Sequence, residues 1–120
     1  MRKQIMVFDD DPLTIKKTAY FFEKQGYEVT AAESGCKAIS SFLGNDFDLV
    51  LCDISESDPD GVTALQAFKA IRPGVKVIIY SGHPFDSIVG HGFHRGVDDF
   101  ISKTCHVQKL VSRINKWLTV

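Results

Sequence analysis

The chain has 120 residues, of which 44% are hydrophobic, and its 14 Lys and Arg residues nearly balance its 15 Asp and Glu residues. This size predicts one domain, residues 1–120, and this composition can form a buried core, which excludes a disordered or fibrous chain. The net charge of −1 gives no broad basic field that would attract a nucleic-acid backbone.

The first apolar run, residues 5–8, predicts a buried strand because it is continuously apolar. A helix is expected next, since Asp11 can cap it and Pro12 suits its first position, and it should end near Gly26. The second apolar run, residues 27–31, predicts a second strand.

Ser34 is placed to cap a second helix that stops at Gly44. The predicted core-facing stripe of this helix consists of Ala38, Ile39, Phe42 and Leu43. The run 49–52 predicts a third strand, and the helix after it should end at residues 72–74. The stripe of this third helix consists of Ala64, Leu65, Phe68 and Ile71.

The run 75–80 predicts a fourth strand and the short run 100–101 a fifth. Between them, residues 84–96 form the weakest predicted helix, because each of its three glycines costs about 1 kcal/mol relative to alanine. The last helix has apolar residues at helical spacing: Val107, Leu110, Val111, Ile114, Trp117 and Leu118. This repetition of strand and helix predicts an α/β fold, a three-layer α/β/α sandwich with a five-stranded parallel sheet.

The cysteines Cys36, Cys52 and Cys105 are far apart and match no zinc or dithiol spacing. Cys52, inside an apolar run, is expected to be a small buried residue rather than a reactive thiol. No segment matches a signal peptide or a membrane span. These features predict a soluble, reduced, cytoplasmic protein with no membrane partner.

Polar side chains stand directly after four of the apolar runs. Asp9 and Asp10 follow the first run, Asp53 the third, Ser81 the fourth, and Ser102 and Lys103 the fifth. In an open parallel sheet, ligands bind at the carboxyl edge of the strands. We therefore expect these side chains to converge on one site.

Carboxylates within about 4 Å of each other repel by about 4 kcal/mol per pair at an effective dielectric of 20, so such a cluster requires a cation. Oxygen ligands without His or Cys favour Mg²⁺ or Mn²⁺. A lysine and a hydroxyl facing that ion suit a phosphoryl group. Asp53, alone on the central strand, is then the natural nucleophile for an acyl phosphate.

The sequence resembles the response-regulator receiver domain, the phosphoacceptor domain of two-component phosphorelay signal transduction. The matching segments are residues 7–12, 48–53, 60–61, 77–82 and 96–103. This resemblance implies a flavodoxin-like sheet with strand order 2-1-3-4-5. It also implies a phosphoprotein that only phosphorylates and dephosphorylates itself and is not an enzyme acting on other substrates.

By resemblance, Asp53 accepts a phosphoryl group from a sensor histidine kinase or a histidine phosphotransfer protein, forming an aspartyl phosphate. Magnesium would be held directly by Asp10 and Asp53, through water by Asp9, and by the main-chain carbonyl of Ser55.

Lys103 would bridge to Asp53 and then to the phosphoryl oxygens, and Ser81 would donate its hydroxyl to them. Phe100 matches the aromatic position that turns inward when Ser81 moves, a bistable packing element. The signal would leave through the surface of the fourth helix, fifth strand and last helix. Its receiver would be a separate downstream target, an output domain outside this chain, or a second copy in a homodimer.

The sequence also departs from the family pattern. The loop after the nucleophile is unusually acidic, with Glu56 and Asp58, and Thr104 stands where the family has a proline after a cis bond. A cis bond before a residue other than proline costs about 2.5–4 kcal/mol, which predicts a trans bond before Thr104. His83, two residues after Ser81, is expected to tune the lifetime of the phosphoryl group.

Simpler readings remain open. The aspartates after the first strand could form only a helix-capping turn, and Phe100 could be static core filling. His91 and His94 are expected to be solvated, as are Lys109, Arg113 and Lys116, which leaves no basic patch for DNA.

Two other functions compete with the receiver reading. One is a pseudo-receiver, a protein-interaction module that is never phosphorylated. The other is an aspartate-nucleophile phosphohydrolase, although the Gly-Thr pair of that family is missing after Asp9-Asp10-Asp11.

Overall fold

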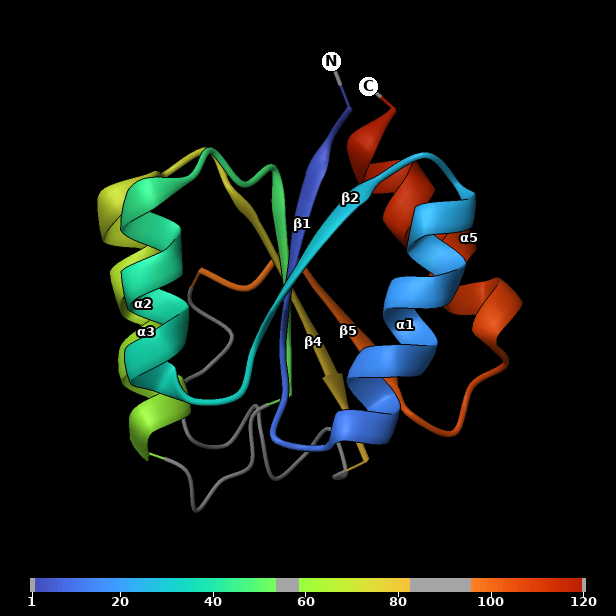
Figure 1. Cartoon of the computed structure of the whole chain (residues 1–120), viewed down its shortest axis with the longest axis horizontal. Coiled ribbons are helices and arrows are strands. Elements are labelled where there is room, and N and C mark those ends of the chain that lie inside the picture. The colour runs from blue at the N-terminus through green and yellow to red at the C-terminus, as the bar shows by residue number, and fades with distance from the viewer. Residues whose placement is uncertain (1, 54–58, 83–95, 120) are drawn as a thin grey trace.

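The computed structural model describes residues 2–53, 59–82 and 96–119. Five strands lie between two layers of helices (Figure 1). The strands are β1 (Gln4–Phe8), β2 (Glu28–Ala32), β3 (Leu49–Cys52), β4 (Lys76–Ser81) and β5 (Asp99–Ser102). The helices are α1 (Pro12–Lys24), α2 (Gly35–Gly44), α3 (Pro59–Ile71) and α5 (Val107–Leu118). The fourth helix predicted over 84–96 falls almost wholly outside the described residues.

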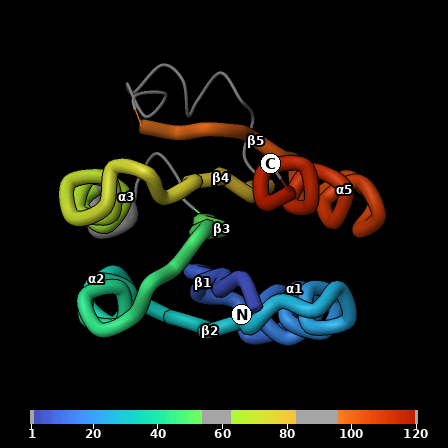
Figure 2. Tube along the Cα trace, turned by 90° about the horizontal axis from the view of Figure 1, so that it is seen from above, coloured from blue at the N-terminus to red at the C-terminus, as the bar shows by residue number. Residues whose placement is uncertain are grey.

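The sheet is parallel throughout, and its strand order is β2-β1-β3-β4-β5. The predicted fold class and order are therefore confirmed. Seen from above, α1 and α5 cover one face of the sheet and α2 and α3 cover the other (Figure 2). Because β1 has β2 on one side and β3 on the other, the order reverses there, and the carboxyl ends of β1 and β3 flank the crevice where such sheets bind ligands.

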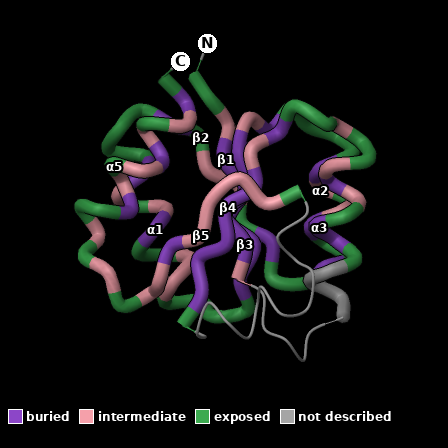
Figure 3. The backbone as a smooth tube through the Cα atoms, turned by 180° about the vertical axis from the view of Figure 1, so that it is seen from behind, coloured by how far each residue is buried: buried purple, intermediate pink, exposed green. Residues whose placement is uncertain are grey.

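Alternation along the strands divides the core into two clusters, one on each face. Ile5 and Val7 of β1 contact the cluster under α1 and α5, whereas Met6 and Phe8 belong to the cluster under α2 and α3. The strands at the centre of the sheet are buried on both faces, while β5 at the edge is mostly half-buried (Figure 3). This explains why the runs of β1, β3 and β4 are continuously apolar.

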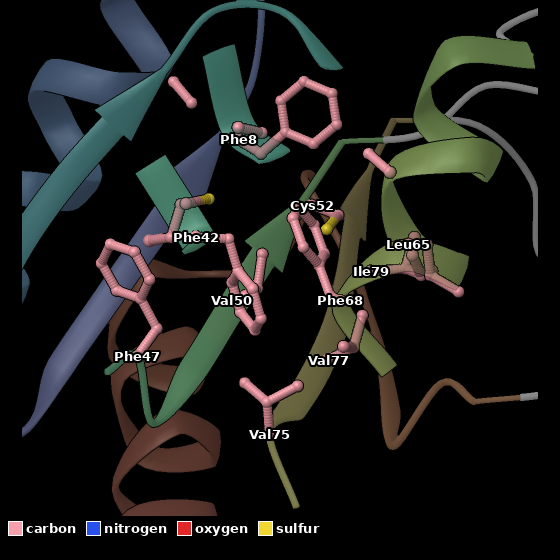
Figure 4. Close-up of a cluster of buried hydrophobic side chains, with 14 residues drawn as sticks. Phe8, Phe42, Phe47, Val50, Cys52, Leu65, Phe68, Val75, Val77 and Ile79 are labelled. Carbon is pink, nitrogen blue, oxygen red and sulfur yellow. The ribbon is translucent and has the colours of Figure 1, made fainter. Parts of the chain in front are cut away.

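An aromatic group holds α2 and α3 together over the sheet. The ring of Phe42 lies 4.7 Å from that of Phe68 and 6.0 Å from that of Phe47, measured between centroids (Figure 4). All three side chains are almost fully buried. Burying one aromatic side chain of this kind stabilises a fold by roughly 1.5–3 kcal/mol.

Two residues of the predicted stripes are not buried. Leu43 is 66% exposed and Ile71 is 41% exposed, so the expectation that both face the core was wrong. Each lies in the last turn of its helix, α2 or α3. Leu43 is also rotated by about 100° from Phe42, which takes the inward position, because a helix has 3.6 residues per turn.

The predicted helix ends of α1 and α2 are confirmed. The side chain of Asp11 accepts a hydrogen bond from Leu13 N–H, and Ser34 caps α2 by accepting one from Lys37 N–H. Gly26, just after α1, has a φ of +93°, a conformation that favours glycine. No helix in the described part of the chain has both the length and the apolar character needed to cross a membrane.

Candidate functional site at the carboxyl edge of the sheet

Backbone hydrogen bonds between neighbouring strands continue one residue beyond the strands and position the backbone of the site residues. Asp9 follows β1, and Asp53 follows β3 with its N–H donating to the carbonyl of Phe8 over 2.9 Å. Lys103 follows β5, and its N–H donates to the carbonyl of Ser81 over 2.9 Å. Ser81 was expected to follow the fourth strand, but it is the last residue of β4. All four backbones are thus aligned at one edge of the sheet, the lower edge in Figure 1.

The predicted charged residues meet at this edge. Asp9, Asp10 and Asp53 each offer a carboxylate oxygen, and these oxygens lie within 4.8 Å of one another. The ammonium of Lys103 donates to Asp9 Oδ2 over 2.8 Å and to Asp53 Oδ2 over 3.1 Å. Sequence reasoning anticipated the pair with Asp53 but not the shorter one with Asp9.

The three consecutive aspartates after β1 have different tasks. Asp11 is exposed and caps α1, with Oδ1 accepting from Leu13 N–H and Oδ2 from the hydroxyl of Thr14. Asp9 is buried, and its Oδ1 accepts from Asp11 N–H over 2.9 Å, which leaves Oδ2 to face Lys103. The capping explanation therefore accounts for Asp11, while Asp9 and Asp10 are turned to the cluster.

Burial and charge act against each other in this cluster. Burial raises the pKa of Asp9 despite the hydrogen bonds from Lys103 and Asp11 N–H, and the nearby carboxylate of Asp53 adds to the rise. Burial alone would lower the pKa of Lys103, but its bonds to Asp9 and Asp53 outweigh this and raise it. With all groups ionised, the three carboxylates and one ammonium carry a net charge of −2, which one divalent cation balances.

The donor set fits a hard divalent ion. Ligands about 2.1 Å from Mg²⁺ lie at most about 4.2 Å apart, so three oxygens within 4.8 Å need only small side-chain rotations. Asp10 is exposed and the Asp53 side chain is 22% exposed, so solvent can supply the remaining ligands. Mn²⁺ accepts the same oxygen donors. Ser55, whose carbonyl was expected to join them, lies outside the described residues.

The other expected site residues have mixed outcomes. Ser81 is buried at 2% exposure and is paired with Ser102 across β4 and β5. Phe100 is half-buried and packs against the core cluster on the α2 and α3 face, which suits static packing and a switch equally. Among the described residues no peptide bond is cis, so the predicted trans bond before Thr104 is confirmed. Glu56, Asp58, His83, His91 and His94 lie outside the described residues.

Three other side chains complete the surroundings. Cys52 is fully buried and burial raises the pKa of its thiol, which confirms its reading as a small hydrophobic residue. The ammonium of Lys103 lies 5.8 Å from the centroid of the buried Tyr80 ring. Sequence reasoning did not predict this contact, because Tyr80 belongs to an apolar run. Arg113, expected to be solvated, instead contacts both carboxylate oxygens of Asp99. The acidic residues at the start of the edge strand were the sequence feature that indicated a cationic partner.

Comparison with known proteins adds independent findings. The profile of the response regulator receiver domain family matches residues 5–115. The chain is 32% identical over 119 residues to the chemotaxis protein CheY of Bacillus subtilis, covering 98% of this chain and 99% of that protein.

Two solved structures are similar along almost the whole chain. A CheY-like response regulator receiver domain protein from Methanospirillum hungatei has 29% identity and a TM-score of 0.89, covering 99% of this chain and 95% of its own. A BeF3-activated DrrB receiver domain has 28% identity and a TM-score of 0.83, with both chains covered fully. Other relatives, transcriptional or response regulators at 29% identity, are longer, and the chain spans 51%, 26% or 50% of their length.

Proposed function

Because the chain belongs to the response regulator receiver domain family of two-component systems, we propose that it is a signalling domain phosphorylated on Asp53. The donor would be a sensor histidine kinase or a histidine phosphotransfer protein. The observation that carries the proposal is the ammonium of Lys103 bound to both Asp53 and Asp9, with Asp10 beside them. As a signalling domain it would act only on its own phosphoryl group.

The geometry supports Asp53 as the nucleophile. Its side chain is 22% exposed, so a donor can reach it, and one oxygen is already held by Lys103. In the transfer, a carboxylate oxygen of Asp53 forms a bond to phosphorus while the bond from phosphorus to the imidazole nitrogen breaks, and the electron pair stays on the imidazole. Lys103 is positioned to follow the negative charge onto the phosphoryl oxygens.

Asp9, Asp10 and Asp53 would hold the Mg²⁺ or Mn²⁺ ion. The bound ion would balance the charge of the carboxylates and of the phosphoryl oxygens. Asp9 uses one oxygen for Asp11 N–H and the other for Lys103, which supports a contact through water rather than a direct one. The Asp10 side chain is exposed, which suits a direct ligand. The carbonyl of Ser55 would complete the protein ligands.

Ser81 and Phe100 would carry the signal from the phosphoryl group. Their strands are neighbours, since β4 pairs with β5 and Phe100 lies opposite Ile79. Movement of Ser81 toward the phosphoryl group would release space that Phe100 fills, which changes the surface around β5 and α5. The receiver of the signal would be a downstream protein, an output domain, or a second copy of the chain. The greater length of several relatives fits an output domain.

The test is incubation with acetyl phosphate and Mg²⁺, followed by intact-mass measurement. We expect the wild type to gain one phosphoryl group and Asp53→Asn to gain none. Asp46→Asn is the matched control, because Asp46 is 96% exposed and pairs only with Arg72 in the described ion pairs. A folded wild type that stays unmodified would contradict the proposal and favour a pseudo-receiver. Continued release of phosphate from an external phosphoester would indicate a phosphohydrolase.

A further inference from the structure

A carboxylate at the start of the edge strand binds two side chains of the last helix. Arg113 Nη1 donates to both oxygens of Asp99, over 2.7 and 2.8 Å, and the indole N–H of Trp117 donates to Asp99 Oδ2 over 3.0 Å. The Asp99 side chain is only 17% exposed. We call Asp99, Arg113 and Trp117 the β5–α5 cluster; Lys76 lies beside it, with its ammonium 5.5 Å from the centroid of the Trp117 ring.

This cluster is electrostatically matched. Burial would raise the pKa of Asp99, but the hydrogen bonds from Trp117 and Arg113 prevail and lower it. The carboxylate is therefore ionised at neutral pH, and a charge-assisted, two-oxygen contact with arginine holds it. The contact joins β5 to α5 fourteen residues later in the sequence.

The residue before Asp99 is anchored to the opposite layer. Asp98 Oδ2 accepts from the ammonium of Lys69 over 2.9 Å and from Val77 N–H over 2.8 Å. Lys69 also donates to the carbonyl of Val75 over 2.7 Å. Successive side chains of a strand point to opposite faces, and here two successive carboxylates fasten the start of β5 to α3 and β4 on one side and to α5 on the other.

Phe100 shares a hydrogen bond with the cluster. Its backbone N–H donates to Asp99 Oδ1 over 2.9 Å, the same oxygen that Arg113 contacts. A change in the backbone of Phe100 therefore changes one of the bonds that Asp99 makes. Asp98, the residue before Asp99, is held by Lys69 of α3 and Val77 of β4, so the bonds of Asp99 are the contacts on the α5 side that such a change would reach.

We propose that Asp99 transmits the state of β5 to the C-terminal half of α5, with Arg113 and Trp117 as the receiving side chains. The part of the surface that changes with phosphorylation then includes the face of α5 around these two residues. This inference rests on the proposed function, because the change at Phe100 begins at Asp53.

The single tryptophan of the chain makes the proposal directly measurable. The resonance of the Trp117 indole N–H is recorded by ¹H–¹⁵N correlation before and after acetyl phosphate and Mg²⁺ are added, and the phosphoryl adduct is measured by mass. We expect the resonance to shift in the wild type. In Asp99→Asn we expect the adduct to form but the phosphorylation-induced shift to fall to less than half. In Asp53→Asn, which controls for Mg²⁺ alone, we expect that shift to be absent.

Two further variants keep the test decisive. Arg113→Gln leaves Asp99 and the Trp117 bond in place, and it should reduce the shift even if Asp99→Asn does not fold. Asp46→Asn, far in sequence and exposed, should keep the full shift. An unmoved Trp117 resonance in phosphorylated wild type, or a full shift in Asp99→Asn and Arg113→Gln, overturns the inference alone. A folded wild type that gains no phosphoryl group overturns the proposed function as well.

Discussion

Removing the positive charge at position 103 should convert the site from a balanced cluster into a repelling one. In Lys103→Met the carboxylates of Asp9, Asp10 and Asp53 keep their places within 4.8 Å but lose the ammonium that bonds two of them. At an effective dielectric of 20, two charges 4.8 Å apart repel by about 3.5 kcal/mol. Since Asp10 is exposed and Asp53 partly so, solvent screens much of this, and we expect a loss of about 1–2 kcal/mol of unfolding free energy.

A divalent ion should reverse that loss. We expect Mg²⁺ to bind Lys103→Met about tenfold more tightly than the wild type, a difference of about 1.4 kcal/mol, because the ion no longer shares the carboxylates with an ammonium. An ion present at a hundred times its dissociation constant adds about 2.7 kcal/mol of stability. The assay is urea unfolding at low ionic strength, with EDTA and then with increasing Mg²⁺.

Lys109→Met is the charge-matched control, since Lys109 is exposed on α5. It should lose almost no stability and keep the wild-type response to Mg²⁺. The reasoning fails if Lys103→Met is as stable as the wild type in EDTA. It fails equally if Mg²⁺ stabilises the variant no more than it stabilises the wild type.

Two further outcomes follow from burial. Burial raises the pKa of Asp9, so the protonated carboxyl favours the folded state and the ionised carboxylate disfavours it. The stability that Asp9 contributes is fully present below its unfolded pKa and is lost as pH rises through the higher folded pKa. Asp9→Asn should therefore stabilise the fold by about 1 kcal/mol at pH 7 but not at pH 3 in urea titrations, while weakening Mg²⁺ binding; equal gains at both pH values would contradict this. Phe42→Ala should cost about 3–5 kcal/mol, measured by thermal or urea unfolding, because Phe42 is fully buried against Phe68. Leu43→Ala, changed at an exposed neighbour, should stay within about 0.5 kcal/mol, and similar losses in the two variants would refute the packing assignment.

The elements of the fold follow from local patterns that the sequence displays directly. Continuous apolar runs identified β1, β3 and β4, and the caps Asp11 and Ser34 located two helix starts. The prediction that Leu43 faces the core was wrong. Helical spacing indicates which residues lie on the same side of a helix, but it does not indicate how far the sheet extends beneath that side. The strand order came from family resemblance, since local pattern does not specify which strands are neighbours.

The site was predictable for a related reason. Its residues stand at the carboxyl ends of strands. A parallel sheet brings these ends to the same edge, whatever the order of the strands in the sheet. Acidic residues at the start of β5 indicate that cationic partners are needed there. The sequence does not identify Lys69 as the partner of Asp98 or Arg113 as that of Asp99, because this depends on how the helices of opposite layers pack on β5. The bond between Lys103 and Asp9 was missed because resemblance pointed to Asp53 as the partner of the lysine.

The ion pair between Asp9 and Lys103 joins residues 94 positions apart, which has a consequence for biosynthesis. A ribosome-bound chain that has not yet exposed residue 103 lacks the ammonium that pairs with Asp9 and Asp53, so the charged cluster is complete only after β5 has joined the sheet. Contacts between residues so far apart in sequence are among the slowest to form in folding, because the chain loses loop-closure entropy before the stabilising contacts are made. The proposed phosphorylation of Asp53 would therefore require a chain whose sheet is complete.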